Sequence, residues 1–136
     1  MAAPKPLSAR SCRRLVAAAR KASLRAYAPF SRLRLGAAVL TSGNRIFSGC
    51  NIENSSYGLT VCAERVAVFN AVCAGHRDVR AVALFTDASR PVPPCGACLQ
   101  VIAEFGENPE VLLAGRAGVE RLRLSDLLPR AFRLLR

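Results

Sequence analysis

Three cysteines at two separate places in the chain restrict how the polypeptide can fold. Cys62 lies two residues before Glu64, and Cys95 and Cys98 lie together in a Pro-Cys-Gly-Ala-Cys segment. A gap of two residues lets both sulfurs of one helical turn bind a single metal ion, and Cys62 can supply a third ligand from the start of another helix. The pattern predicts a zinc site with one open coordination position, where Glu64 can transfer protons to and from a water.

The hydrophobic periodicity predicts an α/β domain in three layers, a five-stranded mixed sheet flanked by helices. An amphipathic helix is expected from Leu7 to about Ala26. The strands expected are Leu33 to Val39, Arg45 to Gly49, Val79 to Thr86, Glu110 to Ala114 and Val119 to Leu124. Further helices are expected from about Val61 to Ala74 with Thr60 as its N-cap, from about Cys95 to Phe105, and at the end of the chain after a Ser125 cap.

The length and cysteine content predict a single domain over residues 1–136 in a reducing compartment. Residues 1–6 and 133–136 are expected to be loose tails. No apolar run approaches the length of a membrane span and no export signal is recognisable, so we expect a cytoplasmic protein. Cys12, Cys50 and Cys73 are then interpreted as small buried hydrophobic residues rather than ligands.

The net charge of +11 raises the question of a nucleic-acid partner. The cations are nearly all arginines, and they are scattered along the chain without a dense run or interleaved aromatic residues. The charge therefore favours a solvated arginine surface, and nucleic acid is not the expected partner.

Both predicted helix starts bear on the zinc site. Cys62 and Cys95 fall at helix N-termini, where free amides and the helix dipole favour the thiolate form. Arg65 follows Glu64 directly and can donate to the sulfurs from outside the ligand set, which would offset the charge of three thiolates on one zinc ion. A plain surface position for Arg65 remains the alternative.

Three segments resemble the small homotetrameric, zinc-dependent cytidine deaminases of pyrimidine salvage: Asn51-Ile52-Glu53-Asn54, Cys62-Ala63-Glu64-Arg65 and Pro94-Cys95-Gly96-Ala97-Cys98-Leu99-Gln100. The resemblance extends from Ala26-Tyr27 to Leu127-Leu128-Pro129. It implies hydrolytic deamination of cytidine and deoxycytidine to uridine and deoxyuridine, with one Zn²⁺ per subunit and Glu64 as the catalytic residue. The first ligand is Cys62 where the related signature has His, and His76 is interpreted as a surface residue.

The resemblance also implies a nucleoside pocket shared between subunits. Asn51 and Glu53 would hold the ribose hydroxyls, although a turn residue and a solvated charge are their alternatives. The other substrate-binding positions that it implies are Phe30, Leu33, Ser55, Tyr57, Ala63 and Phe132. A neighbouring subunit would supply Ser55, Tyr57 and Phe132, the last as a stacking face for the base. Leu33, Leu99 and Pro93 depart from the residues that are frequent in the family, so a related or modified cytosine nucleoside is an alternative substrate.

Three other functions fit parts of the pattern. A redox protein would use the Cys95/Cys98 pair after a buried strand, but leaves Cys62 and Glu64 unexplained. A structural zinc site would need a fourth ligand, which Cys50 or Cys73 could supply. A deaminase of polynucleotide cytosine would explain the basic charge, but it needs an open groove that subunit-closed pockets would not provide.

Overall fold

A mixed five-stranded sheet lies at the centre of the computed structural model, which describes residues 4–135. The elements in chain order are α1 (Ala9–Ser23), β1 (Leu35–Thr41), β2 (Ile46–Cys50), the 3-10 turn η1 (Tyr57–Leu59), α2 (Ala63–Cys73), β3 (Val79–Thr86), α3 (Gly96–Glu104), β4 (Glu110–Gly115), β5 (Gly118–Arg123) and α4 (Leu124–Leu127). Within residues 4–135, no helix is both long and apolar enough to cross a membrane.

The strands follow the order β2-β1-β3-β4-β5. β3 and β4 run parallel, and the other three neighbouring pairs are antiparallel. The central strand β3 spans the predicted residues, and every residue in it except Arg80 is buried. A continuous apolar run is what a strand covered on both faces requires.

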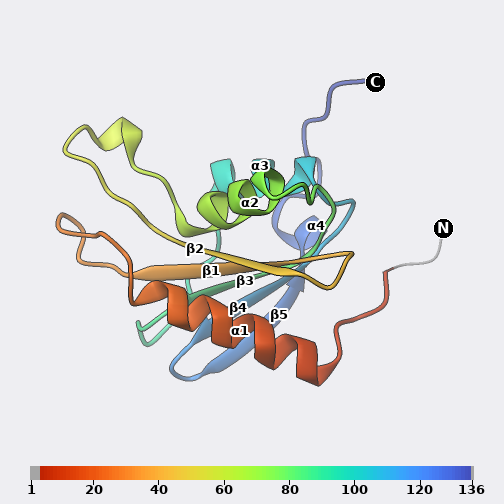
Figure 1. The fold of residues 1–136 in the computed structure, drawn as a ribbon, viewed down its shortest axis with the longest axis horizontal. Coiled ribbons are helices and arrows are strands. Elements are labelled where there is room, and N and C mark those ends of the chain that lie inside the picture. Colours follow the sequence, from red (N-terminus) through yellow and green to blue (C-terminus); the bar gives the residue numbers. More distant parts are fainter. Residues whose placement is uncertain (1–3, 136) are drawn as a thin grey trace.

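Helices cover both faces of the sheet, as the sequence predicted (Figure 1). α1 packs on one face, where it forms a core with Ala38 and Leu40 of β1. α2 and α3 pack on the other face, which receives Ala37 and Val39 of the same strand. Successive side chains of a strand point to opposite faces, so β1 contributes to both cores in alternation.

Two glycines let the helices approach the sheet. A Cβ atom on Gly36 in β1 would lie 1.9 Å from the carbonyl oxygen of Ala19 in α1. A Cβ atom on Gly49 in β2 would lie 2.6 Å from the backbone nitrogen of Ala67 in α2. Only glycine permits backbones this close, so these positions set the distance of α1 and α2 from the sheet.

The predicted N-caps of two helices were wrong. Cys62 is the N-cap of α2, and the hydroxyl of Thr60 instead accepts a hydrogen bond from the backbone nitrogen of Asn54 at 3.1 Å. Arg123 is the N-cap of α4, and its backbone nitrogen donates to the carboxylate of Asp126 at 2.8 Å. Ser125 lies inside that helix. The Thr60 side chain therefore bonds the preceding loop instead of α2, and Arg123 takes the N-cap position of α4.

The segment before α1 is hydrogen-bonded to strands β4 and β5 through Leu7. Its backbone nitrogen donates to Glu110 Oε1 at 3.0 Å, and its carbonyl oxygen accepts from Arg121 Nη2 at 3.0 Å. Arg121 Nε also donates to Glu110 Oε2 at 2.5 Å, which closes a three-residue ring of contacts. Of the predicted N-terminal tail, residues 1–3 lie outside the described residues, while the carbonyl of Pro4 accepts from Arg123.

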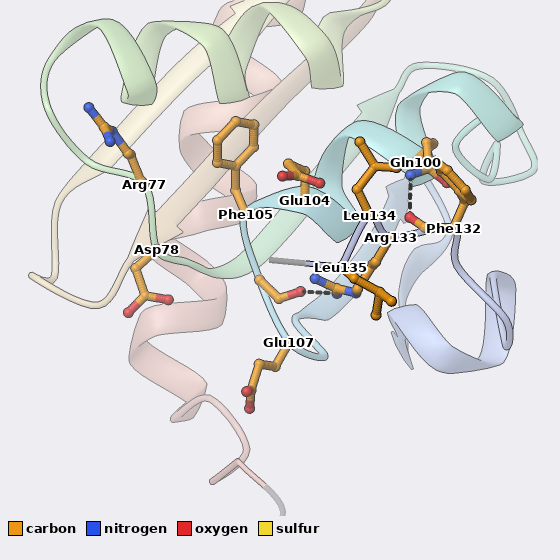
Figure 2. Close-up of a pocket in the computed structure, with 11 residues that line it drawn as sticks. Arg77, Asp78, Gln100, Glu104, Phe105, Glu107, Phe132, Arg133, Leu134 and Leu135 are labelled. Atoms are coloured by element: carbon orange, nitrogen blue, oxygen red, sulfur yellow. Dashed lines mark hydrogen bonds between the residues drawn. The ribbon is translucent and has the colours of Figure 1, made fainter.

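The end of the chain lies across α3 (Figure 2). Gln100 of α3 donates from Nε2 to the carbonyl oxygen of Phe132 at 2.8 Å, and Arg133 donates from Nη2 to the carbonyl of Gly106 at 3.1 Å. This segment, with the end of α3 and the loop between α2 and β3, borders a cavity of about 810 Å³. Residue 136 of the predicted C-terminal tail lies outside the described residues.

Candidate metal centre and active site

The three cysteines meet where α2 and α3 begin. Cys62 and Cys95 are the N-caps of the two helices, and Cys98 lies in the first turn of α3. The Sγ of Cys95 lies 3.9 Å from that of Cys62 and 3.5 Å from that of Cys98, and all three sulfurs lie within 4.8 Å of one another. All six cysteines are free thiols. Cys12 and Cys50 are half-buried and Cys73 is exposed, so the prediction that these three are buried was wrong.

The donor set fits a zinc ion. Three thiol sulfurs close enough to share one ion, on two helix starts, are typical of zinc coordination. Among residues 4–135, no fourth Cys, His, Asp or Glu side chain joins this group, so Cys50 and Cys73 do not complete a closed structural site. One coordination position stays available for water or substrate.

The charges around the sulfurs favour thiolate at Cys62. Hydrogen bonding from the Cys98 thiol, together with the Arg65 guanidinium, lowers the pKa of Cys62 to about 5. The same hydrogen bond and the burial of Cys98 raise the pKa of that thiol. The Cys98 thiol therefore favours ionisation of Cys62, and the ionised Cys62 in turn opposes ionisation of Cys98. A divalent cation among the sulfurs would stabilise all three as thiolates.

Glu64 lies in the first turn of α2 with 2% of its surface exposed. Its Oε1 atom is buried and has no hydrogen-bond partner among the described residues. Burial raises the pKa of this carboxyl, and the nearby Cys62 adds to the effect. Buried polar atoms are nearly always hydrogen-bonded, so an orphaned carboxylate oxygen beside a metal-binding cluster indicates a partner such as water or a substrate nitrogen.

Arg65 points its guanidinium at the cysteine cluster. Its Nη2 atom lies 3.5 Å from the Sγ of Cys62, within hydrogen-bonding range for sulfur. Its Nε atom is buried and has no partner among the described residues. The arginine therefore places a permanent positive charge next to one of the three sulfurs without competing for the metal position.

Asn51 and Glu53 hold the loop that precedes β1. The amide of Asn51 accepts from the backbone nitrogen of Leu35 and donates to the carbonyl of Leu33, each at 2.8 Å. The carboxylate of Glu53 accepts from the backbone nitrogens of Phe30 and Ser31 at 2.9 and 3.1 Å and from the Ser31 hydroxyl. In Figure 1 the loop before β1 and the loop after β2, which contains Asn51 and Glu53, extend together beyond one end of the sheet.

The structure brings some of the predicted substrate residues together. The rings of Phe30 and Tyr57 meet edge to face with centroids 5.7 Å apart, and both border a cavity of about 410 Å³ with Glu53. Ala63, the first residue of α2, is fully buried in the core between the helix and the sheet. Leu33 and Ser55 lie exposed in the two loops, and Phe132 borders the larger cavity at the chain end.

Ser31 and Thr60 also border the smaller cavity, and neither was predicted to belong to the site. A serine after a proline in a polar turn is common in any loop, so the local sequence carried no signal for its bonds to Glu53.

A layered α/β domain with this three-sulfur centre and a buried carboxylate at its side defines a zinc-dependent hydrolytic enzyme. Residues 10–114 match the family model described as "Cytidine and deoxycytidylate deaminase zinc-binding region", and the chain belongs to this family.

Individual relatives agree with the family match. The chain is 47% identical over 121 residues to a cytidine deaminase of Sporosarcina psychrophila, which covers 88% of this chain and 89% of the relative. It is 50% identical over 109 residues to a cytidine deaminase of Halalkalibacterium halodurans, which covers 79% of this chain and 83% of the relative. The crystal structure of cytidine deaminase from Burkholderia pseudomallei superposes with a TM-score of 0.84 at 44% identity, over 88% of this chain and 98% of that one. The predicted family and fold are confirmed.

Proposed function

We propose that the chain catalyses the hydrolytic deamination of free cytidine and deoxycytidine to uridine and deoxyuridine, with release of ammonia. The observation that carries this proposal is the unpartnered carboxylate oxygen of Glu64, buried two residues after one cysteine of the metal cluster. Relatives named cytidine deaminase at 47% and 50% identity support the choice of substrate.

The reaction needs a nucleophilic water and two proton transfers. Cys62, Cys95 and Cys98 would hold the zinc ion, whose Lewis acidity lowers the pKa of a water so that it can attack near neutral pH. Glu64 accepts a proton from the attacking water at Oε1 and delivers it to N3 of the cytosine ring. Attack at C4 gives a tetrahedral carbon. Glu64 then removes the proton of the hydroxyl on C4 and passes it to the amine. The C4–N bond breaks as the C4 carbonyl forms, so that water and cytidine yield uridine and ammonia.

Residues of the loops before β1 and after β2, three of which border the smaller cavity, would bind the nucleoside. Asn51 and Glu53 are proposed to hold the ribose hydroxyls, and Phe30, Leu33 and Tyr57 to line the sugar and base. Ser55, Ala63 and Phe132 complete the proposed set. The clustering of Glu53, Phe30 and Tyr57 at one cavity supports this assignment.

We further propose a cytoplasmic homotetramer of single-domain subunits, acting in pyrimidine salvage, with pockets shared between neighbours. Several large apolar side chains are exposed on the isolated subunit, among them Tyr57 at 74%, Phe132 at 67% and Leu134 at 77%. Large apolar side chains left exposed on a subunit favour burial in a contact between subunits, and Phe132 and Leu134 border the same cavity. A pocket closed by a neighbour would admit a free nucleoside and reject a polynucleotide.

The test is a deaminase assay on zinc-loaded protein of known metal content. Loss of cytidine absorbance is compared with the response to deoxycytidine, a methylated cytosine nucleoside and a cytosine-containing oligonucleotide. We expect turnover of cytidine and deoxycytidine and no turnover of the oligonucleotide. Preferential turnover of the methylated nucleoside would favour a modified nucleoside as the substrate. Preferential turnover of the oligonucleotide would replace the proposal with a polynucleotide deaminase, and no turnover of any of them would refute it.

A further inference from the structure

The groove between α1 and β5 has an apolar floor and a cationic rim. Cys12, Val16 and Ala17 of α1 and Val119 of β5 line a hollow of about 450 Å³, and Arg13 and Arg20 stand at its edge. We call this feature the α1–β5 groove. It lies on the face of the sheet opposite α2 and α3, away from the metal centre.

The groove exists because α1 does not cover the whole sheet face. α1 packs mainly over β1, β2 and β3. β5 is an edge strand, and its residue Val119 pairs with Ala114, whose side chain faces the α1 core. Val119 is nonetheless 49% exposed. An apolar floor is therefore left open beside the helix.

The exposed side of α1 carries a charge that nothing in the described chain neutralises. Arg13, Ala17 and Arg20 share one stripe of the helix, since positions four and seven residues apart lie on the same face. The other exposed cations of α1 and the residues just after it are Arg10, Arg14, Lys21 and Arg25. Within residues 4–135, the ion pairs join Arg116 to Asp87 and Arg121 to Glu110, so none of these cations is paired.

One of the rim cations is held in place. The guanidinium carbon of Arg20 lies 5.7 Å from the centroid of the Phe85 ring, a cation–π contact with a core residue that is 7% exposed. Arg121 also borders the groove, but its charge is engaged by Glu110. Arg13 and Arg20 are thus the free charges at the rim, about 10 Å apart along two helical turns.

We propose that the α1–β5 groove binds an acidic protein segment that carries apolar side chains. An aliphatic side chain of the segment fills the floor at Val16 and Val119, while carboxylates on either side meet Arg13 and Arg20. Charge complementarity steers the encounter, and the apolar contact supplies the discrimination between acidic segments.

Two other polyanions match the groove less well. Single-stranded nucleic acid binds through aromatic stacking as well as phosphate contacts, and α1 contains no aromatic residue. A membrane surface would need the apolar side of α1 to face outward, but Leu15 and Ala19 on that side are fully buried in the core.

The test measures binding to the intact zinc-loaded protein. The probe is a fluorescein-labelled peptide of about 15 residues in which leucines alternate with pairs of glutamates, long enough to cover two turns of α1. Three anionic competitors are used. An all-glutamate peptide and a single-stranded oligonucleotide carry the same net charge as the probe, and vesicles with about 30% phosphatidylserine present an anionic membrane surface. Near 50 mM salt, we expect the leucine-containing peptide to bind with a Kd of about 10–100 μM, and the competitors to bind more weakly.

Two variants separate the charge from the apolar floor. Arg13→Glu/Arg20→Glu is expected to weaken peptide binding about tenfold or more, because it replaces attraction by repulsion. Val119→Ser is expected to weaken it about fivefold without changing the charge. Arg77→Glu/Arg80→Glu changes the net charge equally at two exposed arginines outside the groove and is expected to change binding less than twofold, about the limit of the assay. Cytidine deamination should be unchanged in all three.

Several results would overturn the proposal. Equal binding of the all-glutamate peptide, or equal weakening by the Arg77 and Arg80 control, would mean general attraction without a site. Tighter binding of the oligonucleotide or of the vesicles would assign the surface to that ligand instead. A smaller assembly for the Arg13 and Arg20 variant in sedimentation would assign the groove to a second copy of the chain. If the glutamate variant does not fold, Arg13→Gln/Arg20→Gln replaces it.

Discussion

Arg65 donates from Nη2 to the Sγ of Cys62, two atoms that lie 3.5 Å apart in the first turn of one helix. Because both residues lie at the start of α2, the helix backbone fixes the position of the guanidinium relative to this sulfur. Three thiolates on one divalent cation leave a net negative charge, which opposes the loss of a proton from a water at the same ion. A fixed guanidinium counters part of that charge.

Removing this cation should shift the pH dependence of activity. Without the guanidinium the thiolates make the site more negative, so the nucleophilic water needs a higher pH to lose its proton. Arg65→Ala is expected to move the acidic limb of the kcat profile upward by about one pH unit. Arg65→Lys keeps the charge and should restore part of the shift. A pH profile identical to that of the unmodified protein would rule out this role.

Glu64→Gln should separate metal binding from proton transfer. The amide preserves the size of the side chain but cannot accept the proton, so kcat is expected to fall about 10²- to 10⁴-fold. Zinc content should stay near one ion per chain, because none of the three sulfurs is changed. Metal analysis and turnover are measured on the same sample, and loss of zinc from this variant would contradict the assignment.

Substitution of a cysteine in the metal cluster should reduce the zinc content of the protein, whereas substitution of a cysteine outside it should not. Cys98→Ser removes a buried donor and is expected to reduce bound zinc below about one tenth of the wild-type content after dialysis. Cys73→Ser changes an exposed thiol at the other end of α2 and should leave the zinc content unaltered. Equal zinc loss in the two variants would mean that the metal is held elsewhere.

The Glu110–Arg121 pair predicts a stability that depends on pH. Burial acts to raise the pKa of Glu110, but hydrogen bonds from Arg121 and from the backbone of Leu7 outweigh it and hold the pKa below its usual value. A carboxylate with a lowered pKa in the folded state stabilises the fold above its unfolded pKa, and this contribution is lost as the pH falls through the folded pKa.

Glu110→Gln should therefore lower the free energy of unfolding by about 1–2 kcal/mol at pH 7, with the difference closing below about pH 4. Glu120→Gln, at an exposed position on the neighbouring strand β5, is the control and should change stability by less than about 0.5 kcal/mol. Urea unfolding at several pH values measures both. A difference that persists at low pH would show that lost packing, and not the charge, is responsible.

Gly36→Ala tests how closely α1 approaches the sheet. The added methyl group would overlap the carbonyl of Ala19, so backbone must move, and a loss of about 3 kcal/mol or more is expected. At Gly58 nothing lies within 4 Å of an added Cβ, and Gly58→Ala should be nearly neutral. Thermal unfolding of the two variants provides the comparison. Similar midpoints would mean that α1 can shift without cost.

The layers of the fold could be predicted because their signals are local. β3 matched its predicted bounds because six of its eight residues are apolar, a pattern that fits a buried strand. The boundaries next to loops were less accurate. β1 begins at Leu35 and not at Leu33, and the backbone of this stretch is bonded to the side chain of Asn51 in a later loop. A contact between distant positions leaves no trace in the periodicity of either segment.

The cysteine cluster was predictable for a different reason. The spacing of Cys95 and Cys98 and the position of Glu64 after Cys62 express coordination chemistry directly in the sequence. The bonds of Glu53 to Phe30 and Ser31 do not have such a spacing, because they depend on how two loops meet. The α1–β5 groove was also not predictable, since it arises from the incomplete cover of one sheet face by one helix.

The ring of contacts among Leu7, Glu110 and Arg121 joins positions 103 and 114 residues apart. Synthesis on the ribosome proceeds from the N-terminus, so Leu7 emerges long before its two partners exist. The nascent segment must wait until β4 and β5 have left the exit tunnel, and this ring of contacts can close only after both strands have emerged.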